Sequence, residues 1–285
     1  MIDRINTALE AALHGVHLEG PPRLEEAIRY AVFPGGARIR PRLCLAVAEA
    51  GGAPATRLAD AAACALEFLH CASLVHDDLP CFDDADERRG KPSVHRVYGE
   101  ALAVLTGDAL IVQAFEVLAH AGISAPSQLP SLLATIARAA GARDGLVAGQ
   151  AWESEPSIPL ERYHRAKTGS LFVAAAMAGA QSSGQDPSQW RTMGERLGSA
   201  YQVADDLFDA HATPDSGKPT KQDAALLRPS AVSTYGTAGA VARLRELVGE
   251  AADSIPECKG RSALTGMVVQ MAERLVPPSF RQSAA

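Results

Sequence analysis

Two clusters of aspartates are the residues of this chain whose types and spacing could do chemistry. The first lies in the segment HDDLPCFDD (76–84) and the second in the segment QVADDLFD (202–209). Ligand sets made of oxygen alone suit hard cations, and Mg²⁺ is usually held by a few carboxylates together with substrate phosphates. We therefore expect a magnesium-dependent enzyme that acts on a phosphorylated substrate. The candidate carboxylates are Asp77, Asp78, Asp83, Asp205, Asp206 and Asp209.

The first cluster follows an apolar segment, residues 58–75, whose spacing predicts a helix. Asp77 and Asp78 would lie at the C-terminal end of that helix, where the helix dipole is negative and a nearby cation is favoured. On a regular helix Asp83 would lie about 240° around the axis from Asp77. We expect Pro80 to break that geometry and to let Asp83 return towards Asp77.

Three basic residues, Arg88, Arg89 and Lys91, come directly after the first cluster and could clamp a diphosphate. A solvated charged loop is the plain alternative for such a run of charges. The order of carboxylates, proline and paired arginines favours a functional site. The presence of a second aspartate cluster further along the chain also favours it.

The second cluster closes another apolar segment that is predicted to be helical. Asp205 and Asp209 are four residues apart, so they share one helix face at a separation of about 6 Å and repel each other unless a cation lies between them. Lys218 and Lys221 follow in a long polar segment, residues 211–230, that we expect to be a loop over the phosphates. Two such clusters facing each other could hold metal ions on both sides of one diphosphate, while apolar walls keep water from a carbocation.

The elements that must position these residues are helices, because apolar residues recur at helical spacing along nearly the whole chain. Turn residues such as Gly, Pro and Ser separate the segments. We expect an all-α fold of about ten helices in a single domain, residues 1–285. The predicted helices are 3–14, 22–32, 38–51, 56–78, 99–121, 128–151, 158–183, 187–210, 233–253 and 259–275.

Composition excludes several classes of partner. The formal net charge of −6 argues against nucleic acid, which usually needs a basic face. The five cysteines form no CxxC pair, which indicates reduced thiols in a cytoplasmic protein. No run reaches the roughly 18–20 consecutive apolar residues of a membrane span, so no span is expected.

The chain resembles the trans-isoprenyl diphosphate synthases, and among them the bacterial geranylgeranyl diphosphate synthases of carotenoid and photopigment pathways. The resemblance runs from about residue 25 to about residue 275. It implies an isoprenoid-synthase-type bundle around a central apolar cavity, a homodimer, and about three Mg²⁺ ions. It also implies the 1′-4 condensation of isopentenyl diphosphate with an allylic diphosphate. The segments that carry it are FPGGARIRP (33–41), FLHCASLVHDDLPCFDDADERRGKPSVH (68–95), LTGDAL (105–110), AGQAWESE (148–155), YHRAKTGSLF (163–172) and YQVADDLFD (201–209).

The resemblance also implies roles for individual residues. The metal ligands would be Asp77, Asp83, Asp205 and Asp209, with Asp78 and Asp206 completing the two catalytic clusters. Isopentenyl diphosphate would be bound by Arg40, His70 and Arg89. Gln150 and Glu153 could merely line a polar groove and are assigned no role. The allylic diphosphate, or the cation formed from it, would be bound by Arg88, Lys167, Thr168, Gln202 and Lys218, and Lys167 and Lys218 would also be catalytic.

Two departures from the family pattern concern cations. The family usually has Gly-Gly-Lys-Arg where this chain has Gly36-Ala37-Arg38, so one cation for isopentenyl diphosphate is missing, which Arg38 or Lys91 could replace. After the second cluster, the usual Gly-Lys-x-Thr is replaced by the segment LRPS (227–230). That change keeps a positive charge as an arginine, whose phosphate geometry differs from that of lysine.

Ala72 and Ser73 are the candidates for setting product length. An allylic tail whose diphosphate lies at Asp77 must run down the helix past Ser73 and then past Ala72, about 7.5 Å of helix rise below Asp77. Farnesyl synthases that resemble this chain place an aromatic ring at the Ala72 position, which would stop growth at C15. The small Ala72 predicts a C20 product, unless it only packs against a neighbouring helix.

The starter could be farnesyl, geranyl or dimethylallyl diphosphate. Three alternatives stay open: a farnesyl diphosphate synthase, a non-catalytic partner subunit of a prenyl synthase, and a terpene cyclase. Cyclases usually carry a mixed Asn/Ser/Glu motif in place of the second aspartate cluster and an aromatic-lined pocket, whereas aromatics are only 5% of this chain.

Overall fold

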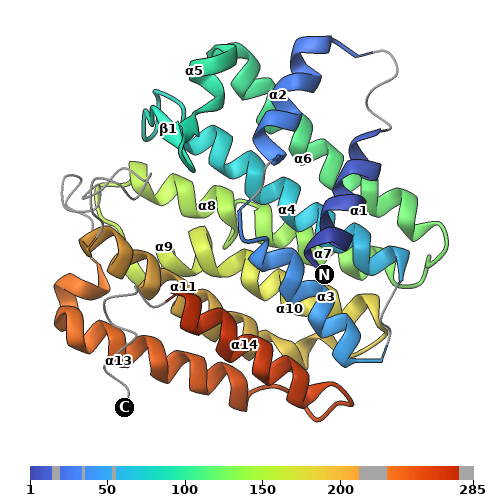
Figure 1. Ribbon diagram of the computed structural model, residues 1–285, viewed down its shortest axis with the longest axis vertical. Helices are drawn as coiled ribbons and strands as arrows, with labels where there is room; N and C mark the ends of the chain where they lie inside the picture. Colours follow the sequence, from blue (N-terminus) through green and yellow to red (C-terminus); the bar gives the residue numbers. More distant parts are fainter. Residues whose placement is uncertain (15–19, 34–35, 53–55, 212–229, 276–285) are drawn as a thin grey trace.

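A computed structural model describes residues 1–14, 20–33, 36–52, 56–211 and 230–275. The described chain is almost entirely helical, as expected for an all-α protein (Figure 1). The α-helices are α1 (Ile2–His14), α2 (Pro22–Val32), α3 (Ile39–Ala50), α4 (Arg57–Asp77), α5 (Val94–Tyr98), α6 (Glu100–Gly122), α7 (Leu129–Ala140), α8 (Leu146–Ala151), α9 (Leu160–His164), α10 (Ser170–Ser182), α11 (Arg191–His211), α13 (Ala231–Asp253) and α14 (Arg261–Leu275). Two short 3₁₀ turns, η1 (Trp152–Ser154) and η3 (Pro187–Trp190), and a π-helical turn, η2 (Arg165–Gly169), lie between them.

Most predicted helices agree with the structure to within one or two residues. Two predicted helices are interrupted in the structure. The helix expected over 128–151 is two helices, α7 and α8, because Gly141 and Gly145 both take extended backbone conformations between them. The helix expected over 158–183 contains the π-helical turn η2 between α9 and α10. A π turn of this kind is often found at a functional site.

The segment after the first aspartate cluster contains a hairpin that was not expected. Strands β1 (Glu87–Arg88) and β2 (Lys91–Pro92) pair antiparallel, with Arg88 opposite Lys91. The two residues of the turn, Arg89 and Gly90, have φ angles of 57° and 73°. This pattern of two positive φ angles belongs to the tight hairpin turns whose twist suits antiparallel strands. Two-residue strands are too short for their alternation to be visible in a sequence.

Helix α4 runs through the middle of the bundle and carries the first aspartate cluster at its end (Figure 1). Thr56 caps its start by accepting a hydrogen bond from the backbone N–H of Ala59. Helices α3, α6 and α10 pack around it, and α6 runs antiparallel to it (Figure 1). The close approach requires glycine: a Cβ on Gly107 of α6 would lie 2.0 Å from the His76 ring, and one on Gly179 of α10 would lie 2.3 Å from a carbonyl oxygen of α3.

Helices α4 and α6 are long and apolar enough to cross a membrane, judged by length and composition alone. In α4, 78% of the most apolar stretch is buried inside the bundle, so its apolar surface forms the core. In α6 only 33% of that stretch is buried. Val104, Leu105 and Val112 are 42%, 50% and 65% exposed on this helix. Helix α6 therefore presents an apolar face that no described element covers.

Candidate active site

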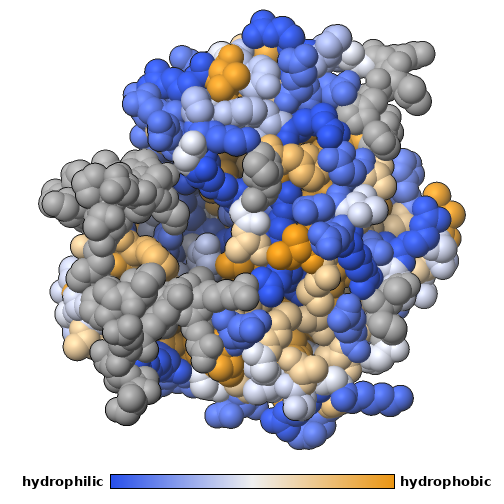
Figure 2. Space-filling view, in the orientation of Figure 1, coloured by the Kyte–Doolittle hydropathy of each residue, from blue (hydrophilic) through white to orange (hydrophobic). Residues whose placement is uncertain are grey.

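A cavity of about 1110 Å³ opens between the end of α4, the hairpin, and helices α6, α8 and α11. Figure 2 shows the hollow, with hydrophilic residues around it, between the β1–α5 end of the molecule and the α11–α13 end. Its mouth is lined by charged residues that include Asp77, Lys167 and Asp205. Its inner walls are apolar, with Ile111 and Phe115 of α6 among them. A polar mouth above an apolar interior suits a ligand with a charged head and a hydrocarbon tail.

The first aspartate cluster folds back on itself at the mouth. Helix α4 ends at Asp77, and the backbone N–H of Asp83 donates a hydrogen bond of 3.0 Å to the carbonyl oxygen of Asp77. Two further backbone hydrogen bonds, from Asp84 to Leu79 and from Ala85 to Asp78, close the same turn. The expectation that Asp83 returns towards Asp77 is confirmed, and α4 ends before Pro80, in agreement with the predicted helix 56–78.

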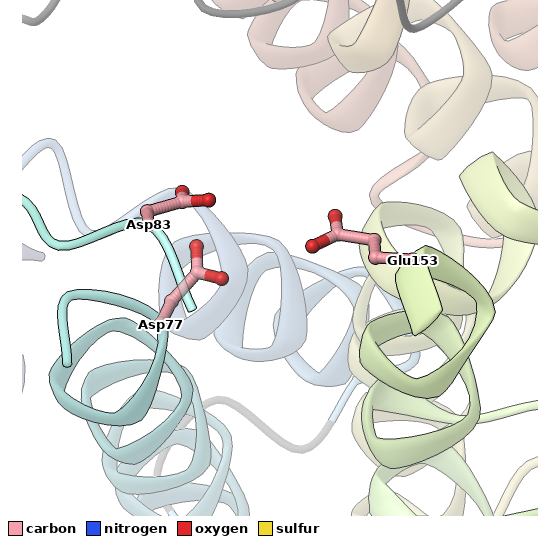
Figure 3. Close-up of side chains that lie close together, drawn as sticks. All are labelled: Asp77, Asp83 and Glu153. Atoms are coloured by element: carbon pink, nitrogen blue, oxygen red, sulfur yellow. The ribbon is translucent and has the colours of Figure 1, made fainter. Parts of the chain in front are cut away.

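A third carboxylate, Glu153 of η1, faces this pair from across the cavity (Figure 3). Oxygen atoms of Asp77, Asp83 and Glu153 all lie within 4.8 Å of one another, which is close enough to share a metal ion. A set of three carboxylates fits the oxygen-only preference of Mg²⁺. Glu153 was assigned no role from the sequence. Helix α8 ends at Ala151, and the 3₁₀ turn that follows points Glu153 towards Asp77. No residue type in this segment marks that change of helix type in the sequence.

Lys167 connects the two sides of this carboxylate group. Its ammonium nitrogen lies 3.3 Å from Oδ1 of Asp77 and 2.5 Å from Oε1 of Glu153. Glu153 also accepts hydrogen bonds from the Tyr163 hydroxyl at 2.5 Å and from the Gln150 amide at 3.1 Å. The π-helical turn η2 carries Lys167 and Thr168, and both line the cavity.

The second cluster lies near the end of α11, and its members have different surroundings. Asp205 is exposed and lines the cavity, and Asp209 is half-buried. Asp206 is only 3% exposed and accepts hydrogen bonds from the Gln202 amide at 2.8 Å and from the backbone N–H of Ala231 at 2.6 Å. Asp206 therefore fastens the start of α13 to α11, and the catalytic role expected for it stays a prediction.

Asp78 repeats this pattern in the first cluster. Its side chain is buried, lies outside the main cavity, and accepts two hydrogen bonds from the guanidinium of Arg88. This pair ties the hairpin to the end of α4, and the catalytic role expected for Asp78 stays a prediction. Arg88, expected at the allylic diphosphate, borders the main cavity with its guanidinium already bound to Asp78.

Thr168 and Gln202 were expected at the allylic substrate, and the structure places them in contact with each other. The Thr168 hydroxyl donates a hydrogen bond of 2.7 Å to Oε1 of Gln202. Since the hydroxyl proton is used in this way, the oxygen lone pairs of Thr168 are available to a positive charge in the cavity. Gln202 supports Thr168 from behind and does not line the cavity.

Arg40, His70 and Arg89 come together at the cavity wall. Arg40 is buried, its Nε has no hydrogen-bond partner within the described chain, and its guanidinium lies over the rings of Phe172 and Tyr201. Burial and the neighbouring guanidinium groups, chiefly those of Arg40 and Arg89, hold the pKa of His70 well below its ordinary value, so the imidazole is neutral near pH 7. Such a group of cations around a neutral histidine fits the binding of an anion.

Four further cations were considered near the substrates, and the structure describes only one of them, Arg38. Arg38, a candidate replacement for the missing lysine, points inwards instead: its guanidinium lies 2.5 Å from Glu67, and both side chains are 2% exposed. It is committed to this buried ion pair and cannot reach a ligand. Lys218, Lys221 and Arg228 lie outside the described residues.

The two candidates for product length line the cavity as predicted. Ala72 and Ser73 both border it below Asp77, and the Ser73 hydroxyl donates back to the carbonyl of His70. Deeper in the cavity the opposite wall is formed by Ile111 and Phe115 of α6. Their contribution was missed, because sequence spacing alone does not show which face of α6 meets α4.

Comparisons with known proteins find relatives along nearly the whole chain. A model of the polyprenyl synthetase family matches residues 21–261. The chain is 53% identical over 276 residues to a protein of Cereibacter sphaeroides named geranylgeranyl diphosphate synthase, with 96% of each chain covered. It is 50% identical over 275 residues to the protein of that name from Rhodobacter capsulatus, with 96% of this chain and 95% of the relative covered.

A solved structure shows the same architecture. The geranyltransferase of Legionella pneumophila superposes with a TM-score of 0.81 at 28% identity, covering 96% of this chain and 94% of that chain. The all-α fold expected from the helical spacing and from the family resemblance is thereby confirmed over nearly the full length. With a family model matched across most of the sequence and relatives at about half identity, this chain belongs to the polyprenyl synthetase family.

Proposed function

We propose that this protein is a geranylgeranyl diphosphate synthase that adds isopentenyl diphosphate to an allylic diphosphate, with farnesyl diphosphate as the immediate precursor of the C20 product. The observation that carries the proposal is the cavity, in which carboxylates and cations surround the mouth and small or apolar side chains line the depth. The names of the relatives from Cereibacter sphaeroides and Rhodobacter capsulatus support this assignment. Carotenoid or photopigment synthesis would be the use of the product.

The reaction forms one carbon–carbon bond and releases diphosphate. The C1–O bond of the allylic substrate breaks, and the diphosphate leaves with the electron pair. The double bond of isopentenyl diphosphate then attacks the allylic C1 through its C4. Loss of a proton from C2 of the former isopentenyl unit restores a double bond, and the released diphosphate takes up that proton.

The carboxylates at the mouth would hold the metal. Asp77, Asp83 and Glu153 converge within 4.8 Å of one another, and Asp205 and Asp209 would add ligands from α11, for about three ions in total. Bound Mg²⁺ would neutralise the diphosphate leaving group.

The other residues at the mouth bind and shield the reacting groups. Lys167 would bind the allylic diphosphate beside Asp77, and the Thr168 oxygen would face the positive charge that develops on the allylic carbon. Arg40, His70 and Arg89 would hold the diphosphate of the isopentenyl unit. Apolar walls such as Ile111 would exclude water, which would otherwise capture the carbocation.

A homodimer would cover the apolar face of α6. Val104, Leu105 and Val112 are exposed there, and an uncovered apolar patch on a long helix is typical of a protein–protein interface. A second copy is the occupant we propose, and sedimentation of the purified protein measures it. We further propose that residues 1–285 act as one domain in the cytoplasm.

Two other functions remain as experimental outcomes. A farnesyl diphosphate synthase would stop at C15, and a non-catalytic partner subunit would fold without elongating any substrate. The lysine and carboxylate network at Lys167 favours an active enzyme, since a purely structural subunit would not need it.

The test is an incubation of the purified protein with Mg²⁺, isopentenyl diphosphate and, in separate reactions, dimethylallyl, geranyl or farnesyl diphosphate. We expect a C20 diphosphate as the main product. We also expect that no C20 diphosphate forms when the metal is chelated. Termination at C15 would establish the farnesyl synthase instead. A folded protein that elongates none of the three starters would refute the proposal.

A further inference from the structure

A second, smaller cavity of about 320 Å³ adjoins the main cavity. Leu74, Arg88 and Arg89 line both cavities, so these residues form a shared wall that carries two cations. Lys91 lines only the smaller cavity, and Asp78 is the one carboxylate among the described residues that line it. Among the described residues, three cations and one anion therefore line a small, partly open volume.

The charges of the smaller cavity do not balance once the ion pairs are assigned. Asp78 is bound to Arg88 through two hydrogen bonds. Arg89 has only the His70 ring as a polar contact, at 3.5 Å, and Lys91 has only the face of the Tyr30 ring, at 5.4 Å. Within the described ranges, neither Arg89 nor Lys91 has a carboxylate partner.

The same imbalance continues into the main cavity. Arg40 is 7% exposed, lines that cavity, and has no ion pair or hydrogen bond with the residues that the structure describes. A buried cation without a partner is costly. Arg40, Arg89 and Lys91 thus form a row of unpaired positive charges that runs from the main cavity into the smaller one, and an anion of more than one charge would satisfy it.

The backbone holds Lys91 in its place in this row. Lys91 is paired with Arg88 across the hairpin, and the tight turn between them has positive φ angles at Arg89 and Gly90. A positive φ at an arginine is strained, since residues with a Cβ pay for that conformation. The strain is consistent with a turn shaped to place Arg89 and Lys91 on one side of the same ligand.

The loop opposite the hairpin lacks a cation of its own. Gly36 borders the smaller cavity, and a Cβ there would lie 3.1 Å from the guanidinium carbon of Arg89. Ala37 is exposed and uncharged, and Arg38 is committed to Glu67 inside the core. Lys91, an exposed residue without a carboxylate partner among the described residues, lines the same cavity as Gly36 and can supply a charge there.

We propose that Lys91 is a substrate-binding residue that holds the diphosphate of the non-allylic substrate together with Arg40 and Arg89. It takes the place of a cation that the loop 36–38 does not provide. The ammonium group offers three donors on a flexible stem, which suits a phosphate bound from the open side of the cavity. This inference rests on the proposed function, because it identifies the ligand as a diphosphate.

The test compares the two substrates in the Lys91→Ala variant. The dissociation constant of isopentenyl diphosphate, measured by calorimetry without an allylic substrate, should rise about tenfold, as expected for the loss of one charge-assisted hydrogen bond. The KM of isopentenyl diphosphate should rise by a similar factor. The KM of farnesyl diphosphate and kcat should stay within about twofold of the wild-type values. Lys259→Ala, which removes an exposed lysine elsewhere, is the matched control and should change none of these constants.

A second variant places the charge on the opposite side of the cavity. Ala37→Lys in the Lys91→Ala background should restore the affinity for isopentenyl diphosphate, since the new ammonium group would enter from the loop 36–38. An unchanged dissociation constant in Lys91→Ala overturns the inference, and so does an equal weakening of both substrates. Failure of the proposed function would be seen separately, as wild-type protein that forms no elongated product.

Discussion

The ammonium nitrogen of Lys167 lies 2.5 Å from a carboxylate oxygen of Glu153. The two residues come from different elements, the π-helical turn η2 and the 3₁₀ turn η1, and Tyr163 donates a second hydrogen bond to the same carboxylate. Glu153 thereby determines where the charge of Lys167 lies relative to Asp77. It also presents its carboxylate to the two aspartates that were expected to bind metal (Figure 3).

Glu153→Gln should lower kcat roughly 10- to 100-fold and raise the Mg²⁺ concentration needed for half-maximal activity, because groups that orient metal ligands typically contribute that much. The measurement is a magnesium titration of initial rates. Glu155→Gln, an exposed glutamate two residues further on, should behave as wild type. A Glu153→Gln variant with wild-type magnesium dependence would remove Glu153 from the metal site.

Ala72→Tyr should shift the main product from C20 to C15. Ala72 borders the cavity below Asp77, so the added ring enters the space of the growing tail instead of the packed core. Chromatography of the dephosphorylated products measures the shift. Ala119→Tyr, at an exposed position of α6, should leave the product at C20. An unchanged product profile in Ala72→Tyr would contradict the role of Ala72 in setting product length.

Phe115→Ala should lengthen the product beyond C20. The His76 ring packs against Gly107 of α6, and Phe115 lies two helical turns, about 12 Å, further along that helix. Loss of its ring would deepen the cavity at the end away from the diphosphate. Phe82→Ala, the same change at the mouth of the cavity, is the control and should not alter product length. If Phe115→Ala still stops at C20, another residue closes the cavity.

Glu67→Gln should destabilise the folded protein by about 3–5 kcal/mol, because it leaves the Arg38 guanidinium buried without its counter-charge. The change in free energy of unfolding is measured by chemical denaturation. Glu49→Gln breaks a partly exposed pair with Arg4 instead and should cost less than about 1 kcal/mol. Equal effects of the two substitutions would show that the burial of the Arg38–Glu67 pair has no energetic consequence.

His164→Gln should reduce the loss of stability in acid. Burial lowers the pKa of His164 from 6.5 to about 4. Between these values the unfolded chain binds the proton and the folded chain does not, so stability falls as the pH decreases through this window and is unaffected above it. The contribution is at most about 3 kcal/mol. Unfolding free energies of the wild type and the variant at pH 7 and pH 5 measure it. His120→Gln, at an exposed site, should retain the wild-type slope.

Most of the helices were predictable from the spacing of apolar residues, as in the segment 58–75 that became α4. Apolar residues at helical spacing, separated by Gly and Pro, marked helices such as α2 and α13 nearly at their observed ends. One continuous helix was predicted across Gly141 and Gly145, because neither glycine by itself forbids a helix. The structure has two helices there, α7 and α8. The hairpin at Arg88 and Lys91 was missed because two-residue strands carry no periodicity.

The sequence by itself determined the chemistry at the mouth of the cavity: two aspartate clusters, their helix ends, and the cations that follow them. Only the tertiary structure decided which members face the cavity. It buried Asp78 and Asp206 in structural hydrogen bonds, brought Glu153 to Asp77, and turned Arg38 into the core. The physical reason is that the sequence determines only which side chains lie near one another along a single helix. Packing between helices determines which polar side chains are buried and which groups form hydrogen bonds with them.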